Sequence, residues 1–366
     1  MTVACEPLRV GIIAPPWAPV PPTAYGGTEG MVDCLARGLC RLGHDVLLVT
    51  TGDATCPVPR RWVLDRSEPS HIGNAMIEIR HVVDAYDALQ HMDIVHDNTV
   101  VGPLYAWRFD SLPVVTTNHG PFDENLAALY RAAAGRVSIV AISEHQASTA
   151  STVPVEAVIH HGIDPEAYPF GRGDGGYVLF LGRMTPEKGA REAALAARAA
   201  GVRLLIAAKL REPAEHAYFD EHVRPLLGAD IEYVGEVGYD QKLALLAGAQ
   251  ALLNPIQWPE PFGLVMIEAL ACGTPVLAFP AGSAPEIVRH AETGFLCPDV
   301  ETMTARIGDA ATIDRRRCRG TVERHFSADR MCREYAALFE RIVSRRHAAG
   351  PRDSMERYSA WSTTSA

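Results

Sequence analysis

The chain alternates short apolar, β-branched runs with alanine-rich stretches of helical period. Such runs predict buried parallel strands, and the stretches between them predict crossover helices. Predicted strands cover residues 8–14, 45–51, 93–98, 113–119, 138–143, 177–182, 203–209, 231–235, 251–255 and 275–279. Predicted helices cover residues 29–44, 187–200, 240–249, 263–272, 284–290 and 328–347. The pattern therefore predicts an α/β protein.

A glycine-rich stretch, YPFGRGDGGY at 168–177, separates the two sets of strands and predicts a linker. We expect two Rossmann-like, doubly wound domains that face each other across a cleft, with ligands outside the carboxyl ends of the strands. The predicted domains are 1–170 and 171–327. A final helix at 328–347 is expected to pack back on the first domain, and the Ser/Thr-rich tail at 348–366 is expected to be disordered.

Composition and charge narrow the possible partners and the cellular location. The net charge is −10, and residues 1–170 carry ten arginines, no lysine and nineteen acidic residues, a net charge of −9. This acidic half disfavours nucleic acid and stable docking on anionic membranes. No apolar run reaches eighteen residues, and the N-terminus does not have the pattern of a signal peptide. Eight cysteines without metal-type spacing indicate a reduced, cytoplasmic protein.

The stretch LFLGRMTPEKG at 179–189 combines the end of a strand with two basic residues at the start of a helix. Lys188 is predicted to lie in the first helical turn, where a cation opposes the helix dipole. An anion bound there by backbone amides, Arg183 and Lys188 would explain that placement. The alternative is a loop arginine and a solvated lysine beside Glu187.

The stretch NPIQWPEPFGLVMIEAL at 254–270 holds two glutamates on either side of a Pro-Phe-Gly turn. Gly263 allows backbone amides to approach a ligand closely at the start of the next helix. Because a carboxylate repels phosphate, Glu260 is expected to face hydroxyl groups or a developing positive charge, and Glu268 another part of the same ligand. The alternative is a helix-entry glutamate followed by a solvated one.

Two elements of the first half complete the set of candidates. Gly26 and Gly27 directly precede a predicted helix, where the backbone can approach an anion closely. The alternative is a turn in which Gly27 or Thr28 caps the helix. The GxGxxG fingerprint is absent, which disfavours an NAD enzyme. His119 follows a strand, where it can donate to a sugar hydroxyl, act as an acid or base, or merely bond local backbone. No DxD or HExxH motif supports a metal site.

Taken in chain order, these motifs resemble those of the family 4 (group 1) retaining glycosyltransferases of the GT-B fold. The resemblance spans about residues 8–340 and is most specific over 177–297, where the motif E-x7-E is Glu260 and Glu268. It implies retaining transfer of a hexose-type sugar from a nucleotide diphosphate sugar, UDP- or GDP-linked, to an acceptor hydroxyl. No cofactor and no metal are implied, and the acceptor is not identified.

The resemblance also implies roles for the candidate residues. Catalysis is assigned to Arg183 and Lys188, which would neutralise the diphosphate, to Glu260, which would contact hydroxyls of the transferred sugar, and to His119 beside that sugar. Glu268 would bind the ribose. Removing either cation should cost on the order of 10²-fold or more in rate.

Donor binding would also involve backbone groups from both domains. The resemblance implies that Phe262, Gly263 and Leu264 approach the phosphate and the sugar. Gly26 and Gly27 would close over the diphosphate from the first domain. The missing DxD motif agrees with this arrangement, because fixed cations and helix N-termini can stabilise the leaving diphosphate in place of a metal.

Two departures from the family pattern bear on donor choice. His161 stands where an asparagine is frequent. The stretch NPIQWPE at 254–260 replaces the usual Pro-Ser at the end of its strand and is expected to place Gln257 and Trp258 near the sugar site. The alternatives are another GT-B enzyme, such as an epimerase or a phosphorylase, and a non-catalytic nucleotide-sugar-binding protein. Phosphorylases of this fold need a lysine-bound pyridoxal phosphate, which three lysines in the whole chain disfavour.

Overall fold

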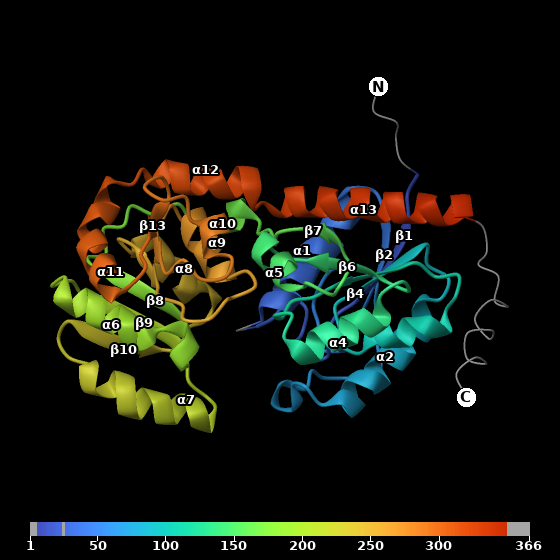
Figure 1. The fold of residues 1–366 in the computed structure, drawn as a ribbon, viewed down its shortest axis with the longest axis horizontal. Coiled ribbons are helices and arrows are strands. Elements are labelled where there is room, and N and C mark those ends of the chain that lie inside the picture. The colour runs from blue at the N-terminus through green and yellow to red at the C-terminus, as the bar shows by residue number, and fades with distance from the viewer. Residues whose placement is uncertain (1–5, 24–25, 350–366) are drawn as a thin grey trace, which may run out of the picture.

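The computed structural model describes residues 6–23 and 26–349, which form two α/β bodies side by side (Figure 1). The first sheet has the strand order β3-β2-β1-β4-β5-β6-β7, and the second has the order β10-β9-β8-β11-β12-β13. The strands of both sheets pair in parallel throughout. The predicted α/β class with two doubly wound domains is confirmed.

The ten predicted strands are all present, and three more lie at sheet edges. The first sheet consists of β1 (Arg9–Ile13), β2 (Asp45–Thr50), β3 (Arg60–Trp62), β4 (Ile94–Asp97), β5 (Val114–Thr117), β6 (Ser138–Ala141) and β7 (Val155–Val158). The second consists of β8 (Val178–Arg183), β9 (Leu204–Lys209), β10 (Ile231–Gly235), β11 (Leu252–Asn254), β12 (Val276–Ala278) and β13 (Gly294–Leu296). The strands that the pattern did not predict are β3, β7 and β13.

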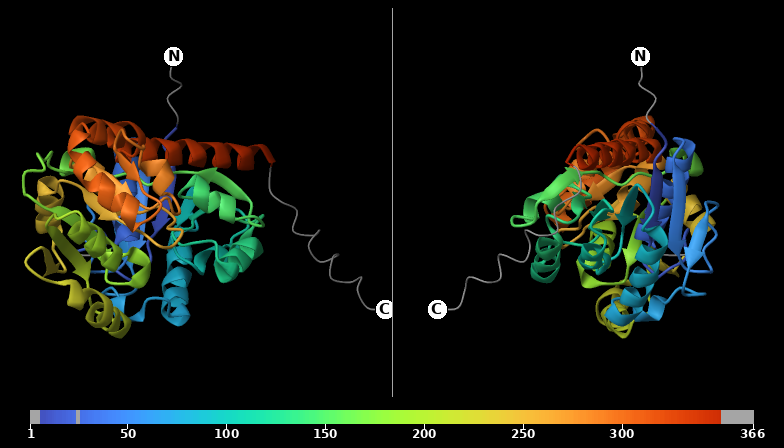
Figure 2. Two further views of the ribbon diagram at one scale, coloured as in Figure 1. Left: turned by 60° about the vertical axis from the view of Figure 1, so that its left-hand side comes forward. Right: turned by 90° about the vertical axis from the view of Figure 1, so that its right-hand side faces the viewer.

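Helices cover both faces of each sheet (Figure 1, Figure 2). Those that precede the second sheet are α1 (Gly27–Arg41), α2 (Ala75–Leu89), α3 (Gly102–Tyr105), α4 (Glu124–Ala133) and α5 (Glu144–Thr149). Those that follow β8 are α6 (Ala190–Ala199), α7 (Pro213–Tyr218), α8 (Tyr239–Gly248), α9 (Leu264–Ala271), α10 (Ala284–Ile287), α11 (Val300–Ile307), α12 (Arg315–His325) and α13 (Ala328–Ala349). Each of the six predicted helices corresponds to one of these, with shifted ends.

The start of α6 differs from the expectation for Lys188. Residues Pro186–Lys188 form a short 3₁₀ turn, and Gly189 then adopts a left-handed conformation with φ of 82° before α6 begins at Ala190. A Cβ atom at Gly189 would overlap the backbone of Pro255, so glycine is needed both for its φ and for this close approach. Lys188 therefore lies in the turn before the helix, not in its first turn.

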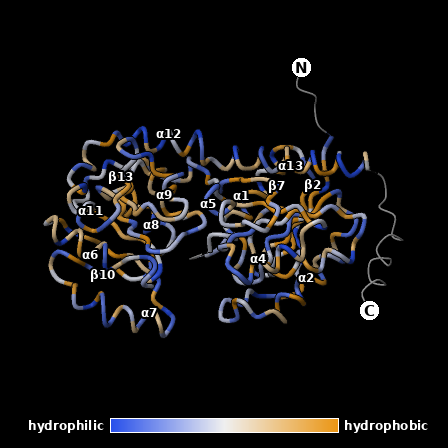
Figure 3. The backbone as a smooth tube through the Cα atoms, viewed as in Figure 1, coloured by the Kyte–Doolittle hydropathy of each residue, from blue (hydrophilic) through white to orange (hydrophobic). Residues whose placement is uncertain are grey.

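Alternating side chains of β1 supply the cores on the two faces of the first sheet. Val10 and Ile12 are fully buried against α1 and α13, whereas Ile13 faces the cluster formed with α2 and α4. The hydropathy of the chain follows this arrangement, with apolar residues concentrated in the strands (Figure 3). Because successive side chains of a strand point to opposite faces, one short apolar run serves both layers.

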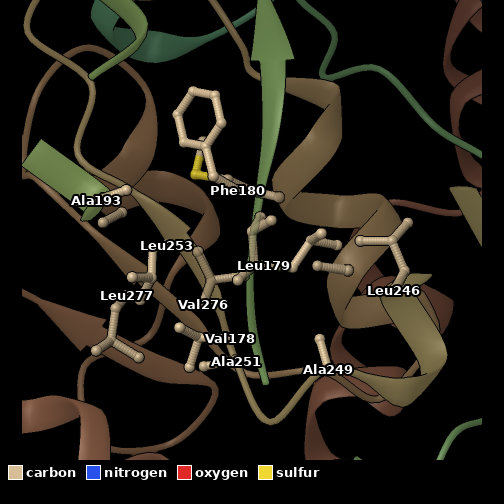
Figure 4. Close-up of a cluster of buried hydrophobic side chains, with 14 of the residues drawn as sticks. Val178, Leu179, Phe180, Ala193, Leu246, Ala249, Ala251, Leu253, Val276 and Leu277 are labelled. Atoms are coloured by element: carbon tan, nitrogen blue, oxygen red, sulfur yellow. The ribbon is translucent and has the colours of Figure 1, made fainter. Parts of the chain in front are cut away.

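The second domain has one continuous core. Val178, Leu179 and Phe180 of β8 lie among the buried residues of β11, β12, α6 and α8, and Figure 4 shows part of this cluster. Fully burying each such side chain contributes about 1.5–3 kcal/mol. This packing fixes the carboxyl ends of β8 and β11, from which the loops of the candidate site emerge.

The chain crosses back to the first domain between α12 and α13. The backbone N–H of Ile163 donates to Phe326 O at 3.0 Å, and Ala328 N–H donates to Ile163 O at 2.7 Å, which joins the two crossing segments. Helix α13 then packs on α1 and on the first sheet, where Tyr335 lies against His96 (Figure 1). The expected disordered tail at 348–366 falls largely outside the described residues, because α13 extends to Ala349 and the rest is not described.

Among the helices that the structure describes, none is both long enough and apolar enough to cross a membrane.

Candidate active site

The loops that follow β8 and β11 meet at a single ion pair. The Lys188 ammonium bonds Glu260 Oε1, and both side chains are more than four-fifths buried. The strands β8 and β11 are neighbours at the point where the strand order of the second sheet reverses. Ligands of open α/β sheets bind at such switch points, so two predicted site residues lie where this architecture places a ligand.

Backbone contacts hold the two loops in this arrangement. Gln257 N–H donates to Glu187 O at 2.8 Å, and Glu260 N–H donates to Trp258 O at 2.8 Å. The Lys188 ammonium also lies 5.6 Å from the centre of the Trp258 ring, within cation–π range. The unusual residue Trp258 therefore helps to fix the position of Lys188.

Arg183 lies at the end of β8, in the same region but with a different partner. Its Nη2 atom is 3.3 Å from Glu187 Oε1, and its side chain is 38% exposed. An exposed pair of this kind contributes little stability, so the guanidinium can exchange Glu187 for an anionic ligand at low cost.

The N-termini of two helices, one from each domain, meet beside the ion pair. Gly27 begins α1 and Leu264 begins α9, and a Cβ atom at Gly27 would lie 2.9 Å from Leu264 Cδ1. Gly263 caps α9 with φ of 83°, and the position of its absent Cβ is 3.7 Å from Glu260 Oε2. Backbone N–H groups in a first helical turn lack intrahelical acceptors, and both positive dipole ends favour an anion between them.

The other residues of these two turns set their shape. Gly26 precedes α1 with an extended backbone, and a Cβ there would crowd Pro22 and the Glu29 carboxylate. Phe262 is buried, and its carbonyl accepts a hydrogen bond from the Ser283 hydroxyl. Both predicted backbone elements thus lie at the junction of the two domains.

Glu268 lies on α9 and is held by two residues that the sequence did not indicate. Its Oε1 atom accepts hydrogen bonds from the Lys242 ammonium at 2.6 Å and from the Tyr168 hydroxyl at 3.1 Å. Both hydrogen bonds are made to Oε1, so neither Lys242 nor Tyr168 bonds Oε2. Only three lysines occur in the chain, and this scarcity was the one available signal for Lys242.

His119 follows β5 at the carboxyl edge of the first sheet. Its Nε2 atom is 3.0 Å from Asn98 Oδ1, and its Nδ1 atom is 3.4 Å from His161 Nε2. Desolvation by the surrounding protein lowers the pKa of His119 from 6.5 to about 3. The ring is therefore neutral near pH 7 and is suited to hydrogen bonding rather than to acid catalysis through an imidazolium.

His161 and Glu286 connect the two domains. His161 is buried, and its ring packs edge-to-face on Phe262 of the second domain with centres 5.2 Å apart. The Glu286 carboxylate accepts hydrogen bonds from the backbone N–H groups of Glu144 and His145 at 2.9 and 2.8 Å. These contacts join the strand ends of one sheet to the loops of the other.

Within the described residues, no three or more His, Cys, Asp or Glu side chains converge as metal ligands would.

Two family models match consecutive parts of the chain. The model described as Glycosyltransferase Family 4 matches residues 25–167, and the model described as Glycosyl transferases group 1 matches residues 170–317. The two matches meet in the segment between β7 and β8, where the first sheet ends and the second begins.

Similar proteins of known name support the same assignment. A glycogen synthase of Mycobacterium tuberculosis is 26% identical over 345 residues, covering 78% of this chain and 83% of the relative. The structure of AviGT4, a glycosyltransferase involved in avilamycin A biosynthesis, has a TM-score of 0.69 at 26% identity and covers 92% of this chain and 98% of its own. Anabaena Alr3699/HepE, solved with UDP and glucose, has a TM-score of 0.72 at 18% identity and covers 90% and 99%.

The two consecutive family matches, the doubly wound domains and the E-x7-E motif around the ion pair lead to one conclusion. The chain belongs to the family 4 (group 1) glycosyltransferases, has their GT-B fold and is a glycosyltransferase.

Proposed function

We propose that this enzyme transfers a hexose-type sugar from a UDP- or GDP-linked donor to an acceptor hydroxyl, with retention of configuration and without a metal. The donor diphosphate lies between the N-termini of α1 and α9. The observation that carries this proposal is the contact between Gly27 and Leu264 beside the Lys188–Glu260 pair. Two converging helix N-termini and a buried lysine form a site suited to a multiply charged anion.

In the proposed complex, each charged residue leaves its partner in the protein and binds the donor instead. Lys188 turns from Glu260 to the diphosphate, and Arg183 gives up Glu187 for the same group. Glu260 is then free to accept hydrogen bonds from hydroxyls of the sugar. Lys188 and Glu260 are already mostly buried in the free protein. Part of the free-energy cost of removing water from these charges is therefore met before the donor binds.

The reaction breaks the bond between the anomeric carbon and a diphosphate oxygen, and forms one between that carbon and the acceptor oxygen. Negative charge grows on the leaving diphosphate, where Lys188, Arg183 and the first-turn amides of α9 stabilise it. The acceptor hydroxyl loses its proton as it bonds the carbon. In this proposal an oxygen of the departing diphosphate, on which negative charge grows, receives that proton.

Glu268 is the proposed ribose ligand. Lys242 and Tyr168 both bond its Oε1 atom and so fix the carboxylate in one orientation. The other oxygen can accept hydrogen bonds from the ribose hydroxyls. Anabaena Alr3699/HepE was solved with UDP-glucose, so UDP-linked donors are the first to be tested here.

Thermal unfolding with UDP, GDP, ADP and dTDP, alone and sugar-linked, tests the donor proposal. A ligand at about 100 times its Kd adds roughly 2.7 kcal/mol to the free energy of unfolding. We expect one uracil or guanine nucleotide to raise the midpoint of the wild type and to lose this effect in Glu268→Ala. Glu323→Ala removes an exposed glutamate and is the matched control. This variant should keep the full rise in the unfolding midpoint. If no nucleotide stabilises the wild type, the proposed donor class is wrong.

Two further measurements test the mechanism once a donor is known. Turnover should be unchanged by EDTA, and the anomeric proton couplings of the product should report the configuration of the donor. Loss of activity in EDTA that Mg²⁺ or Mn²⁺ restores would contradict the metal-independent mechanism.

A further inference from the structure

A chain of hydrogen bonds runs from the first strand of the sheet to the interface between the domains. It begins at the carbonyl of Ile13 at the end of β1 and passes through Asn98, which follows β4. From there it continues through His119 to His161. The strands β1 and β4 are neighbours at the switch point of the first sheet, so Asn98 is anchored to its rigid centre.

The orientation of the Asn98 amide follows from its partner on β1. A carbonyl oxygen can only accept, so the atom of Asn98 that lies 3.1 Å from Ile13 O must be the Nδ2 donor. The backbone N–H of Asn98 donates to the same oxygen at 3.0 Å. The other amide atom, which faces His119, is therefore Oδ1, an acceptor.

The tautomer of His119 follows from that amide. Its Nε2 atom, 3.0 Å from Asn98 Oδ1, must carry the proton and donate. In a neutral imidazole the other nitrogen then holds a lone pair, so Nδ1 accepts from His161 Nε2–H across 3.4 Å. The hydrogen bond at Nε2 is shorter than the one at Nδ1. The Nδ1 hydrogen bond is therefore the weaker one, and a ligand can replace its partner more easily.

The surroundings of His119 keep its ring neutral. The titratable groups that face it are His96 of β4 and His161. Burial lowers the pKa of His96 to about 3, and burial together with the neighbouring histidines and Arg330 lowers the pKa of His161 well below 6.5. Arg330 of α13 lies behind His161 and donates to its carbonyl at 3.3 Å. These groups offer no carboxylate that would stabilise an imidazolium at His119.

We propose that Asn98 is a positioning residue that commits His119 to accept, through Nδ1, a hydrogen bond from a hydroxyl of the bound sugar. A ligand hydroxyl that donates to Nδ1 replaces the longer bond from His161, and its oxygen can in turn accept from His161 Nε2–H. His119 thus recognises the sugar as an acceptor, a role that differs from the donor, acid–base and backbone-bonded roles that the sequence left open. The inference about the sugar rests on the proposed function, but the tautomer can be measured in the free protein.

The tautomer is tested by ¹⁵N NMR with labelled histidine rings, with the His119 signals identified by their loss in His119→Gln. We expect His119 to be a single Nε2–H tautomer between pH 5 and 8. Asn98→Leu removes the acceptor, and both tautomers should then be populated. Asn125→Leu, an exposed control on α4, should leave the signals unchanged. A single Nε2–H tautomer in Asn98→Leu would overturn the role of Asn98.

A second variant keeps the test decisive if Asn98→Leu does not fold. Asn98→Asp retains an acceptor for Nε2–H but adds a negative charge, which stabilises the imidazolium. We expect the Nε2–H tautomer to persist and the pKa of His119 to rise, so that protonation and loss of turnover on the acid side both begin at higher pH than in the wild type. An unchanged titration of His119 would contradict the contact.

The direction of the hydrogen bond to the sugar is tested with modified donors. Fluorine accepts hydrogen bonds but does not donate them. If His119 accepts a hydrogen bond, one hydroxyl of the sugar donates it. Replacing that hydroxyl by fluorine or by hydrogen should then weaken binding of the nucleotide-sugar about 10-fold in both cases, a cost within the range for one lost hydrogen bond. Tight binding of the deoxyfluoro donor together with weak binding of the deoxy donor would show that His119 donates, and would overturn the proposal.

These measurements separate the two proposals. If no nucleotide-sugar binds the wild type, the proposed function fails, whereas the NMR result on Asn98 and His119 still stands or falls by itself. If donors bind and the tautomer is mixed in the wild type, only the role of Asn98 fails. Once a donor is known, Asn98→Leu should weaken binding of the nucleotide-sugar by up to about 10-fold and leave binding of the nucleoside diphosphate unchanged, because a misoriented ring loses only the hydrogen bond to the sugar.

Discussion

The facing edges of the two domains differ in how they carry charge. The second domain holds all three lysines of the chain, and two of them, Lys188 and Lys242, pair with the two glutamates of the E-x7-E motif. The first domain, despite its net charge of −9, presents glycine backbone and a neutral histidine to the same site. In the proposed complex, the second domain therefore supplies the charged side chains that bind the anion, and the first supplies backbone amides and a neutral ring that form hydrogen bonds.

This division explains how buried charges are tolerated before a ligand binds. A lysine or a glutamate alone in such a position would carry a large desolvation cost. Pairing Lys188 with Glu260 and Lys242 with Glu268 offsets that cost within the second domain. Because all four of these residues belong to the second domain, neither ion pair depends on a charge supplied by the first domain.

The largest expected effect follows removal of the central cation. Lys188→Ala should lower turnover of the donor by about 10²-fold, because the growing negative charge on the leaving group loses a proposed positive partner. Steady-state kinetics measures this loss. Arg203→Ala serves as the control, because it removes an exposed cation that directly precedes β9 and pairs with Glu232 of β10. Equal activity in both variants would remove Lys188 from the mechanism.

A smaller effect is expected at the second lysine. Lys242→Met leaves the Glu268 carboxylate with only the Tyr168 hydroxyl, so its orientation is less well fixed. We expect the Kd of the donor to rise about 10-fold, and Tyr168→Phe to raise it by less, since a neutral hydrogen bond contributes less than an ion pair. Calorimetric titration measures both constants. A larger effect in Tyr168→Phe than in Lys242→Met would reverse the assignment.

The contact between the helix N-termini predicts a modest effect on closure. In Gly27→Ala the new Cβ lies 2.9 Å from Leu264 Cδ1, a contact that a shift of the flexible leucine side chain can relieve. We expect kcat/KM for the donor to fall about threefold, well short of the roughly 10²-fold cost of a misplacement by 1 Å. Gly30→Ala on the same helix meets nothing closer than 4.0 Å and is the control. Adding Leu264→Ala to Gly27→Ala should remove part of the loss.

The smallest expected effect concerns stability rather than turnover. Burial raises the pKa of Glu29, in the first turn of α1, from 4.5 to about 7. The folded protein thus binds this proton more tightly than the unfolded chain, so the stabilisation is complete below pH 4.5 and is lost as the pH rises through 7. Urea unfolding should show Glu29→Gln gaining on the order of 2 kcal/mol relative to the wild type between pH 5 and 8. A constant difference across this range would contradict the buried, protonated carboxyl.

The sequence predicted the central strands but missed three at the sheet edges. Central strands are buried on both faces, which gives the long apolar runs of β1 and β8. The edge strands β3 and β7 read Arg-Arg-Trp and Val-Glu-Ala-Val, without such a run. Helix α2 lies between predicted strands, but its mixed sequence does not have the alanine-rich period that marks the predicted helices.

For the site, local motifs could be predicted but the partners of their residues could not. The turn at Gly263 and the two glutamates follow from sequence because glycine and helix signals are local. Lys242 reaches Glu268 from another helix, and Asn98 reaches His119 from another strand. Such pairs depend on the order of strands in the sheet, which spacing along the chain does not encode.

The central claim is that the charged side chains of the second domain bind the diphosphate of the donor and that His119 of the first domain recognises the sugar. Calorimetric titration of the nucleoside diphosphate and of its sugar-linked form into the wild type, Lys188→Ala and His119→Ala tests it most directly. We predict that Lys188→Ala weakens both ligands by at least about 10-fold, or 1.4 kcal/mol, and that His119→Ala weakens only the sugar-linked one. If His119→Ala weakens the nucleoside diphosphate as much as Lys188→Ala does, the division between the two domains is wrong.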